Sequence, residues 1–100
     1  MTVEEVAEYN EEALICDGLN EAIIGVAERV NLGPVAAYSV EKILDILIPQ
    51  MELSEEDLKE IPEDEQETYK YTMAIEYFEY NIKGAWMGEF TPVFIYTNEF

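Results

Sequence analysis

The side chains that could do chemistry in this chain are almost all carboxylates. Its 100 residues include 23 Asp and Glu, 5 Lys and Arg and no His, which gives a net charge of −18. Without a histidine, a serine or cysteine nucleophile lacks its usual general base, and one cysteine cannot make a zinc site. No catalytic motif is present. We therefore expect a protein that is not an enzyme and has no catalytic, metal-binding or cofactor-binding residues.

The densest carboxylate cluster consists of Glu63, Asp64, Glu65 and Glu67. Carboxylates can bind Ca²⁺ or Mg²⁺ or act as a general acid/base pair, but this cluster lacks the alternating ligands and central glycine of a calcium loop. We interpret it as a solvated acidic loop, and a divalent-cation module or an unrecognised enzyme stays a minor alternative. A run of aromatic residues beyond it is interpreted as core packing rather than as a ligand platform: Tyr69, Tyr71, Tyr77, Phe78 and Tyr80.

The composition predicts one folded domain spanning residues 1–100. Hydrophobic residues make up 49% and aromatics 12% of the chain, which is too apolar for a disordered acidic segment and enough for one core. No apolar run of about 18 residues occurs, and the opening MTVEEVAEYNEE lacks the features of a signal peptide. Cys16 has no disulfide partner and is interpreted as a small, half-buried apolar residue. An intracellular protein is expected.

The first third of the chain predicts one helix and two strands. Thr2 and Glu5 have the spacing of a capping box, so a helix begins at the residue after Thr2. Residues 21–30 fit either a helix or a strand. The strand is favoured because a glycine weakens the helix and because the turn-forming residues 31–34 place 35–38 as its partner strand.

The middle of the chain predicts two helices separated by an acidic connection. Ser39 is placed to cap a helix that carries an apolar stripe over residues 40–47. Residues 51–68 are the most acidic segment, interrupted by Ile61-Pro62, and we expect a solvated connection with little structure beyond a turn capped by Ser54. A long helix is expected from about residue 67 to residue 83, ended by Gly84.

The tail predicts two short strands, 85–87 and 93–96, joined by a turn. Both faces of the second strand are apolar, so it is expected either at the centre of the sheet or under another molecule. The predicted fold is α+β, with a small, mostly antiparallel sheet and helices packed on one face. One core is expected to unite Val40, Ile43, Leu44, Leu47, Phe78, Ile82, Trp86 and Ile95.

Three parts of the chain, taken together, carry a family resemblance. These are 12–18 with 21–25, 34–38 leading into 40–47, and 74–82 with 84–89 and 91–94. They resemble a group of small, uncharacterised acidic proteins encoded by tailed bacteriophages, and the EYFEYN and GEFTP segments are the most specific. The acidic stretch from about 59 to 69 looks like an insertion relative to shorter members. The resemblance implies an origin in the cytoplasm of an infected bacterium and assigns no activity.

Charge and implied origin together suggest an inhibitor that mimics nucleic acid. Five scattered cations exclude direct binding to DNA or RNA, so the expected partner is a basic bacterial protein that handles nucleic acid. A compact chain of this length is about 34 Å across, a distance over which duplex DNA carries about 20 phosphates. The expected contact centres on residues 60–67, and its carboxylates are Glu56, Glu60, Glu63, Asp64, Glu65, Glu67, Glu76 and Glu79.

The alternative hypothesis is a structural or accessory phage protein that acts through an apolar surface, as a homodimer in its simplest form. The apolar residues of the tail motivate this alternative, with Phe94 and Tyr96 as the expected self-association contacts and Phe100 nearby. An even scatter of carboxylates over the surface would favour plain solubility, whereas their concentration on one side would favour mimicry.

Overall fold

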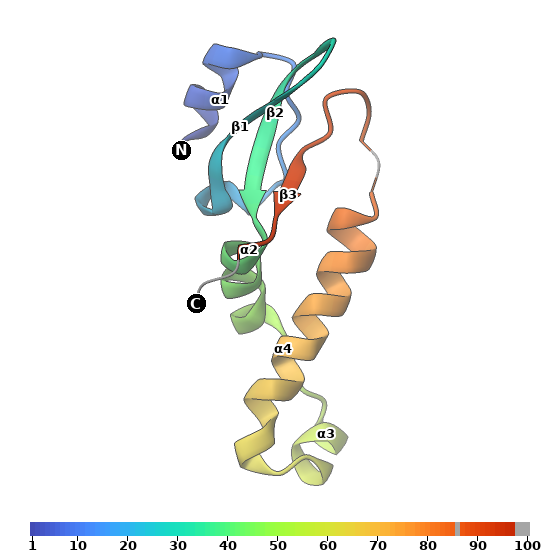
Figure 1. Cartoon of the computed structure of the whole chain (residues 1–100). Helices are drawn as coiled ribbons and strands as arrows, with labels where there is room; N and C mark the ends of the chain where they lie inside the picture. Colours follow the sequence, from blue (N-terminus) through green and yellow to red (C-terminus); the bar gives the residue numbers. More distant parts are fainter. Residues whose placement is uncertain (86, 98–100) are drawn as a thin grey trace.

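The computed structural model describes residues 1–85 and 87–97. A three-stranded sheet, helices α1 and α2 and the C-terminal part of α4 form a body, and a helical arm projects from it (Figure 1). The molecule measures 52 × 30 × 22 Å. Its radius of gyration of 16.0 Å exceeds the roughly 13 Å expected of a compact chain of 100 residues. The arm accounts for this elongation.

Strands β1 (Ile23–Arg29) and β2 (Leu32–Ser39) form the predicted antiparallel pair. The turn between them lies at Val30 and Asn31, and not at residues 31–34 as predicted, because residues 32–34 already belong to β2. Asn31 has φ 64°, a left-handed conformation that asparagine tolerates and that tight hairpin turns require. Position 34 can be a proline because the pairing with β1 is irregular there and β3 pairs only with residues 37–39 of β2.

Strand β3 (Val93–Ile95) lies beside β2 and runs parallel to it, so the sheet has the mixed order β1-β2-β3. The predicted antiparallel tail hairpin is therefore wrong. Ala85 and Met87 belong to no strand, and Trp86 lies outside the described residues. β3 is an edge strand rather than a central one. The fold class, a small α+β domain with helices packed on a sheet, is confirmed.

The predicted helix starts in the body are confirmed in atomic detail. In α1 (Val3–Tyr9) the Glu5 amide donates to Thr2 Oγ1 at 3.1 Å, and the Thr2 amide donates to Glu5 Oε1 at 3.1 Å. In α2 (Val40–Leu47) the Lys42 amide donates to Ser39 Oγ at 3.2 Å. Each bond satisfies a backbone donor that the first helical turn leaves without a partner.

The core lies between the sheet, α2 and the C-terminal part of α4. Tyr38 of β2 and Phe78 are fully buried there, and the Phe94 ring lies 6.1 Å from Tyr38 and 5.3 Å from Phe78. Since Phe94 faces the core, its neighbours on β3 point away, and Ile95 is 37% exposed. The placement of Ile95 in the core is thus wrong, and that of Trp86 lies outside the described residues. The other predicted members are buried or pack against the core: Val40, Ile43, Leu44, Leu47, Phe78 and Ile82.

Helix α4 (Gln66–Tyr77) continues into a π-helical segment, η4 (Phe78–Lys83), and ends at Gly84 as predicted. The Gly84 amide donates to the Glu79 carbonyl at 3.0 Å, the five-residue spacing of a π-helix. A Cβ at Gly84 would lie 2.9 Å from that carbonyl oxygen. Glycine is therefore required where the helix closes.

The arm, residues 51–72, is more ordered than the sequence predicts. After the 3₁₀ turn η2 (Ile48–Gln50), it contains α3 (Glu55–Glu60), the 3₁₀ turn η3 (Glu63–Glu65) and the start of α4. The expectation of little structure here is wrong. The predicted capped turn at Ser54 is confirmed as a second capping box, in which the Asp57 amide donates to Ser54 Oγ at 3.1 Å, but it is followed by further helical segments that were not predicted. No residue of the arm is buried.

Candidate functional site

Six of the eight predicted contact carboxylates lie on the arm (Figure 1). The arm contains nine acidic residues and two lysines, a net charge of −7 within 22 residues. All six of these side chains are exposed. The carboxylates that the arm brings together are Glu56, Glu60, Glu63, Asp64, Glu65 and Glu67.

The other two predicted carboxylates lie apart from the arm. Glu76 is nine residues beyond Glu67, about two and a half helical turns, so the two residues face opposite sides of α4. Glu79 lies in η4 and pairs with Lys83 at 3.5 Å. The eight residues therefore do not form one continuous stripe.

The acidic side chains have few cationic partners. Within residues 1–85 and 87–97, the pair Lys83–Glu79 is the one ion pair closer than 4.0 Å, and both of its side chains are exposed. Lys59 and Lys70 of the arm form no ion pair with any other described residue. The carboxylates of the arm are thus available to an external cation.

No three His, Cys, Asp or Glu side chains of the described residues are grouped closely enough to hold a metal ion. The cluster at residues 63–67 instead follows a 3₁₀ turn and the start of a helix. In the same part of the chain, no helix is long and apolar enough to cross a membrane.

The aromatic run along α4 behaves differently from the prediction. Phe78 is buried, but Tyr69, Tyr71, Tyr77 and Tyr80 are all exposed, with exposed fractions from 40% to 82%. Core packing is therefore wrong for the four tyrosines. The reason is that only one side of the C-terminal part of α4 contacts the body, while its first turns belong to the projecting arm.

A groove of about 440 Å³ lies on the arm between its tip and α4. The Gln66 side-chain amide donates to the Ile61 carbonyl at 3.2 Å and holds the two walls together. Its lining combines two carboxylates with apolar and hydroxyl groups: Glu60, Ile61, Pro62, Glu65, Thr68, Tyr69 and Thr72. The sequence identified the two carboxylates of this groove, but it did not indicate that Tyr69 joins them.

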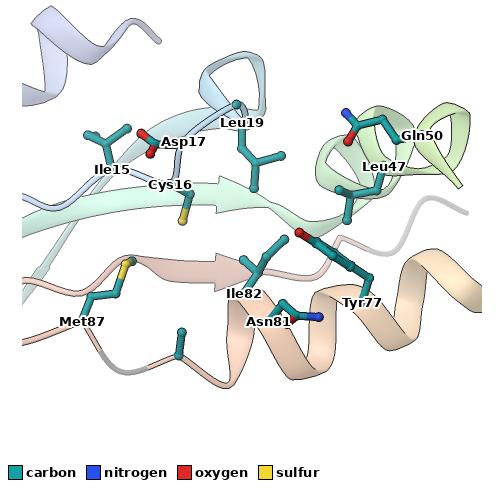
Figure 2. A pocket seen from close by; sticks show the side chains of 12 residues that line it. Ile15, Cys16, Asp17, Leu19, Leu47, Gln50, Tyr77, Asn81, Ile82 and Met87 are labelled. Atoms are coloured by element: carbon teal, nitrogen blue, oxygen red, sulfur yellow. The ribbon is translucent and has the colours of Figure 1, made fainter.

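A second cavity, of about 340 Å³, lies in the body between the loop 15–19, the end of α2 and the C-terminal part of α4 (Figure 2). Figure 2 shows Ile15, Leu19 and Ile82 around it, with Tyr77 from α4 and Asn81 from η4. Its lining combines apolar and polar groups, and Asp17, Gln50 and Asn81 supply polar side chains.

The thiol in the wall of this cavity is suited to packing rather than to reaction. Cys16 is buried, more fully than the half-buried position predicted, and its amide donates to the Tyr38 hydroxyl at 2.8 Å. Burial raises the pKa of the Cys16 thiol, so the protonated, poorly nucleophilic form dominates at neutral pH. Burial likewise raises the pKa of Tyr38 to about 12.

The two residues predicted to mediate self-association differ in orientation. Phe94 packs inward against Tyr38 and Phe78, whereas Tyr96 is 59% exposed. Lys83 Nζ donates to the Tyr96 hydroxyl at 2.8 Å and lies 5.0 Å from the ring centroid. A contact between copies through this edge would therefore use Ile95 and Tyr96, and not Phe94.

No protein-family model, no curated protein and no solved structure matches this chain.

Proposed function

We propose that this chain is a phage-encoded protein that acts in the host cytoplasm, where it binds and inhibits a basic bacterial protein that handles nucleic acid. The observation that supports this proposal is the arm: a projecting element with a net charge of −7 and no buried residue. An element that projects from the body and buries none of its own residues is free to enter a groove on another molecule. There its carboxylates stand in for phosphates.

The charge density supports the same proposal. Along the 52 Å length of the molecule, duplex DNA would carry about 30 phosphates. The chain carries 18 net negative charges over that length, more than half the density of DNA. Such a surface accelerates encounter with a basic partner by electrostatic steering, and the acceleration falls as salt is added.

The experiment is affinity capture from a bacterial lysate at low and high salt, with two variants of equal charge. In the arm variant, Glu60, Glu63 and Glu67 become Gln and Asp64 becomes Asn. In the body variant, Glu4, Glu8, Glu11 and Glu12, all exposed, become Gln. We expect wild type and body variant to capture the same basic protein, and the arm variant to lose it.

Competition with duplex DNA completes this test, because a mimic and its model compete for one groove. If both variants lost capture of the partner equally, the contact would not lie on the arm. Capture that neither salt nor added DNA weakens would contradict charge mimicry altogether.

A second candidate function is that of an accessory phage protein assembled through its tail strand. The observation that favours it is the position of β3 at the edge of the sheet, with Ile95 and Tyr96 exposed beside an unpaired strand edge. Light scattering of wild type and of Tyr96→Ala measures this directly. A mass of one chain at high concentration would contradict it.

A further inference from the structure

We propose that the groove on the arm binds an arginine side chain of the basic partner. This inference rests on the proposed function, because it names the type of residue that the arm recognises. The groove lies within the segment of highest charge and is lined by Glu60 and Glu65, by Ile61 and Pro62, and by the α4 residues Thr68, Tyr69 and Thr72.

The two carboxylates of the groove come from different elements and are both unused. Glu60 ends α3 and Glu65 ends η3. Among the described residues, neither side chain takes part in an ion pair or in a hydrogen bond. A guanidinium carries five donors in a planar fork and can bond one or both carboxylates, whereas an ammonium is a point charge.

The rest of the lining suits the remainder of an arginine side chain. Ile61 and Pro62 offer apolar surface to its methylene stem, and such stems commonly lie along apolar surface while the charge stays in water. Tyr69 is 40% exposed, and a guanidinium stacks on an aromatic face more readily than an ammonium does. Charge complementarity therefore draws in any cation, and the groove selects arginine among them.

The test is titration calorimetry of the full chain with hexa-arginine and hexa-lysine peptides in about 150 mM NaCl, where exposed charges are largely screened. Two pairs of variants are compared. Glu65→Gln is matched by Asp64→Asn. The second substitution removes the same charge at the neighbouring position, which does not line the groove. Tyr69→Ala is matched by Tyr80→Ala, which removes a tyrosine of η4 that is 82% exposed and does not line the groove.

We expect the wild type to bind hexa-arginine more tightly than hexa-lysine. Tyr69→Ala should weaken hexa-arginine binding about two- to fivefold and remove this preference, while Tyr80→Ala leaves it intact. Glu65→Gln should weaken hexa-arginine binding about threefold more than Asp64→Asn does, because it removes a directional bond as well as a charge. Circular dichroism checks that each variant is folded.

The outcomes separate this inference from the proposed function. If both peptides bind with a steep salt dependence, but the members of each variant pair behave alike, the arm recognises charge only and the groove inference is overturned. If neither peptide binds even at low salt, the proposed function fails together with the inference.

Discussion

The body and the arm of this protein are both acidic, the arm more densely so, and they are held together in different ways. The body buries large side chains from several elements against one another, with Tyr38, Ile43 and Phe78 almost inaccessible to solvent. The arm buries none. Its helices depend on local bonds such as the capping box between Ser54 and Asp57. Stability therefore rests mainly on the body, while the arm carries the densest surface charge.

The strongest test of this contrast is one substitution made in both regions. Leu44→Ala removes a buried side chain of α2 and should cost about 2–5 kcal/mol of unfolding free energy, since the loss of transfer energy and the cavity add together. Leu58→Ala removes a side chain of α3 that is 52% exposed. It should cost less than about 1 kcal/mol. Urea denaturation measures both, and equal costs would mean that the arm has a core of its own.

The second test uses the pH dependence of stability, because the buried Tyr38 hydroxyl of the body has a raised pKa. Burial raises the pKa of Tyr38 to about 12 in the folded chain from its ordinary value of 10.0. Above pH 10 the unfolded chain releases this proton while the folded chain retains it, so stability is complete below pH 10 and is lost between pH 10 and 12. Two pH units correspond to a loss on the order of 3 kcal/mol. The raised pKa of Cys16 acts in the same direction.

Two variants assign the alkaline loss to the body. Tyr38→Phe lowers stability at neutral pH by about 1–3 kcal/mol, because the Cys16 amide loses its acceptor, and it should flatten the decline above pH 10. Tyr69→Phe on the arm is the matched control, because it removes the hydroxyl of an exposed tyrosine. A profile in Tyr38→Phe as steep as in wild type would assign the decline to other groups.

The smallest expected effect is that of salt. Screening weakens repulsion among carboxylates, so raising NaCl from about 10 to 300 mM should add about 1 kcal/mol of stability, or roughly 4–8 °C in melting temperature. The arm variant with four neutralised carboxylates should start higher and rise less. A flat curve in wild type would show that its charges are already compensated.

The parts of the fold that the sequence predicted are those coded locally. The cap at Ser39 and the apolar stripe that follows it define α2 within nine residues, and Thr2 with Glu5 defines α1. The pairing of β3 is different in kind. Ala37 and Val93 are paired although they lie 56 residues apart in the sequence. A strand of three residues is too short for its sequence to indicate which strand it pairs with or in which direction. Local reasoning therefore gave a hairpin where the chain forms a parallel pair.

The candidate site divides in the same way. The concentration of charge identified the segment 60–67. The same concentration led to the prediction of a solvated connection, whereas the segment contains helical turns. The helical spacing of the tyrosines suggested that they pack in the core. Spacing alone does not show how far along the helix the body extends, so the exposure of these tyrosines could not be predicted. Only the placement of α4 shows that Tyr69 lies beyond that layer and beside Glu65 in a groove.

The length of the arm has a practical consequence for measuring the size of this protein in solution. A rod-like particle experiences more friction than a sphere of equal mass, and a body of 52 × 30 × 22 Å will diffuse more slowly than its 11.5 kDa mass suggests. A single chain will therefore leave a gel-filtration column somewhat ahead of compact standards of the same mass. Sedimentation equilibrium or light scattering, which report mass independently of shape, will distinguish a long monomer from a pair of chains joined at β3.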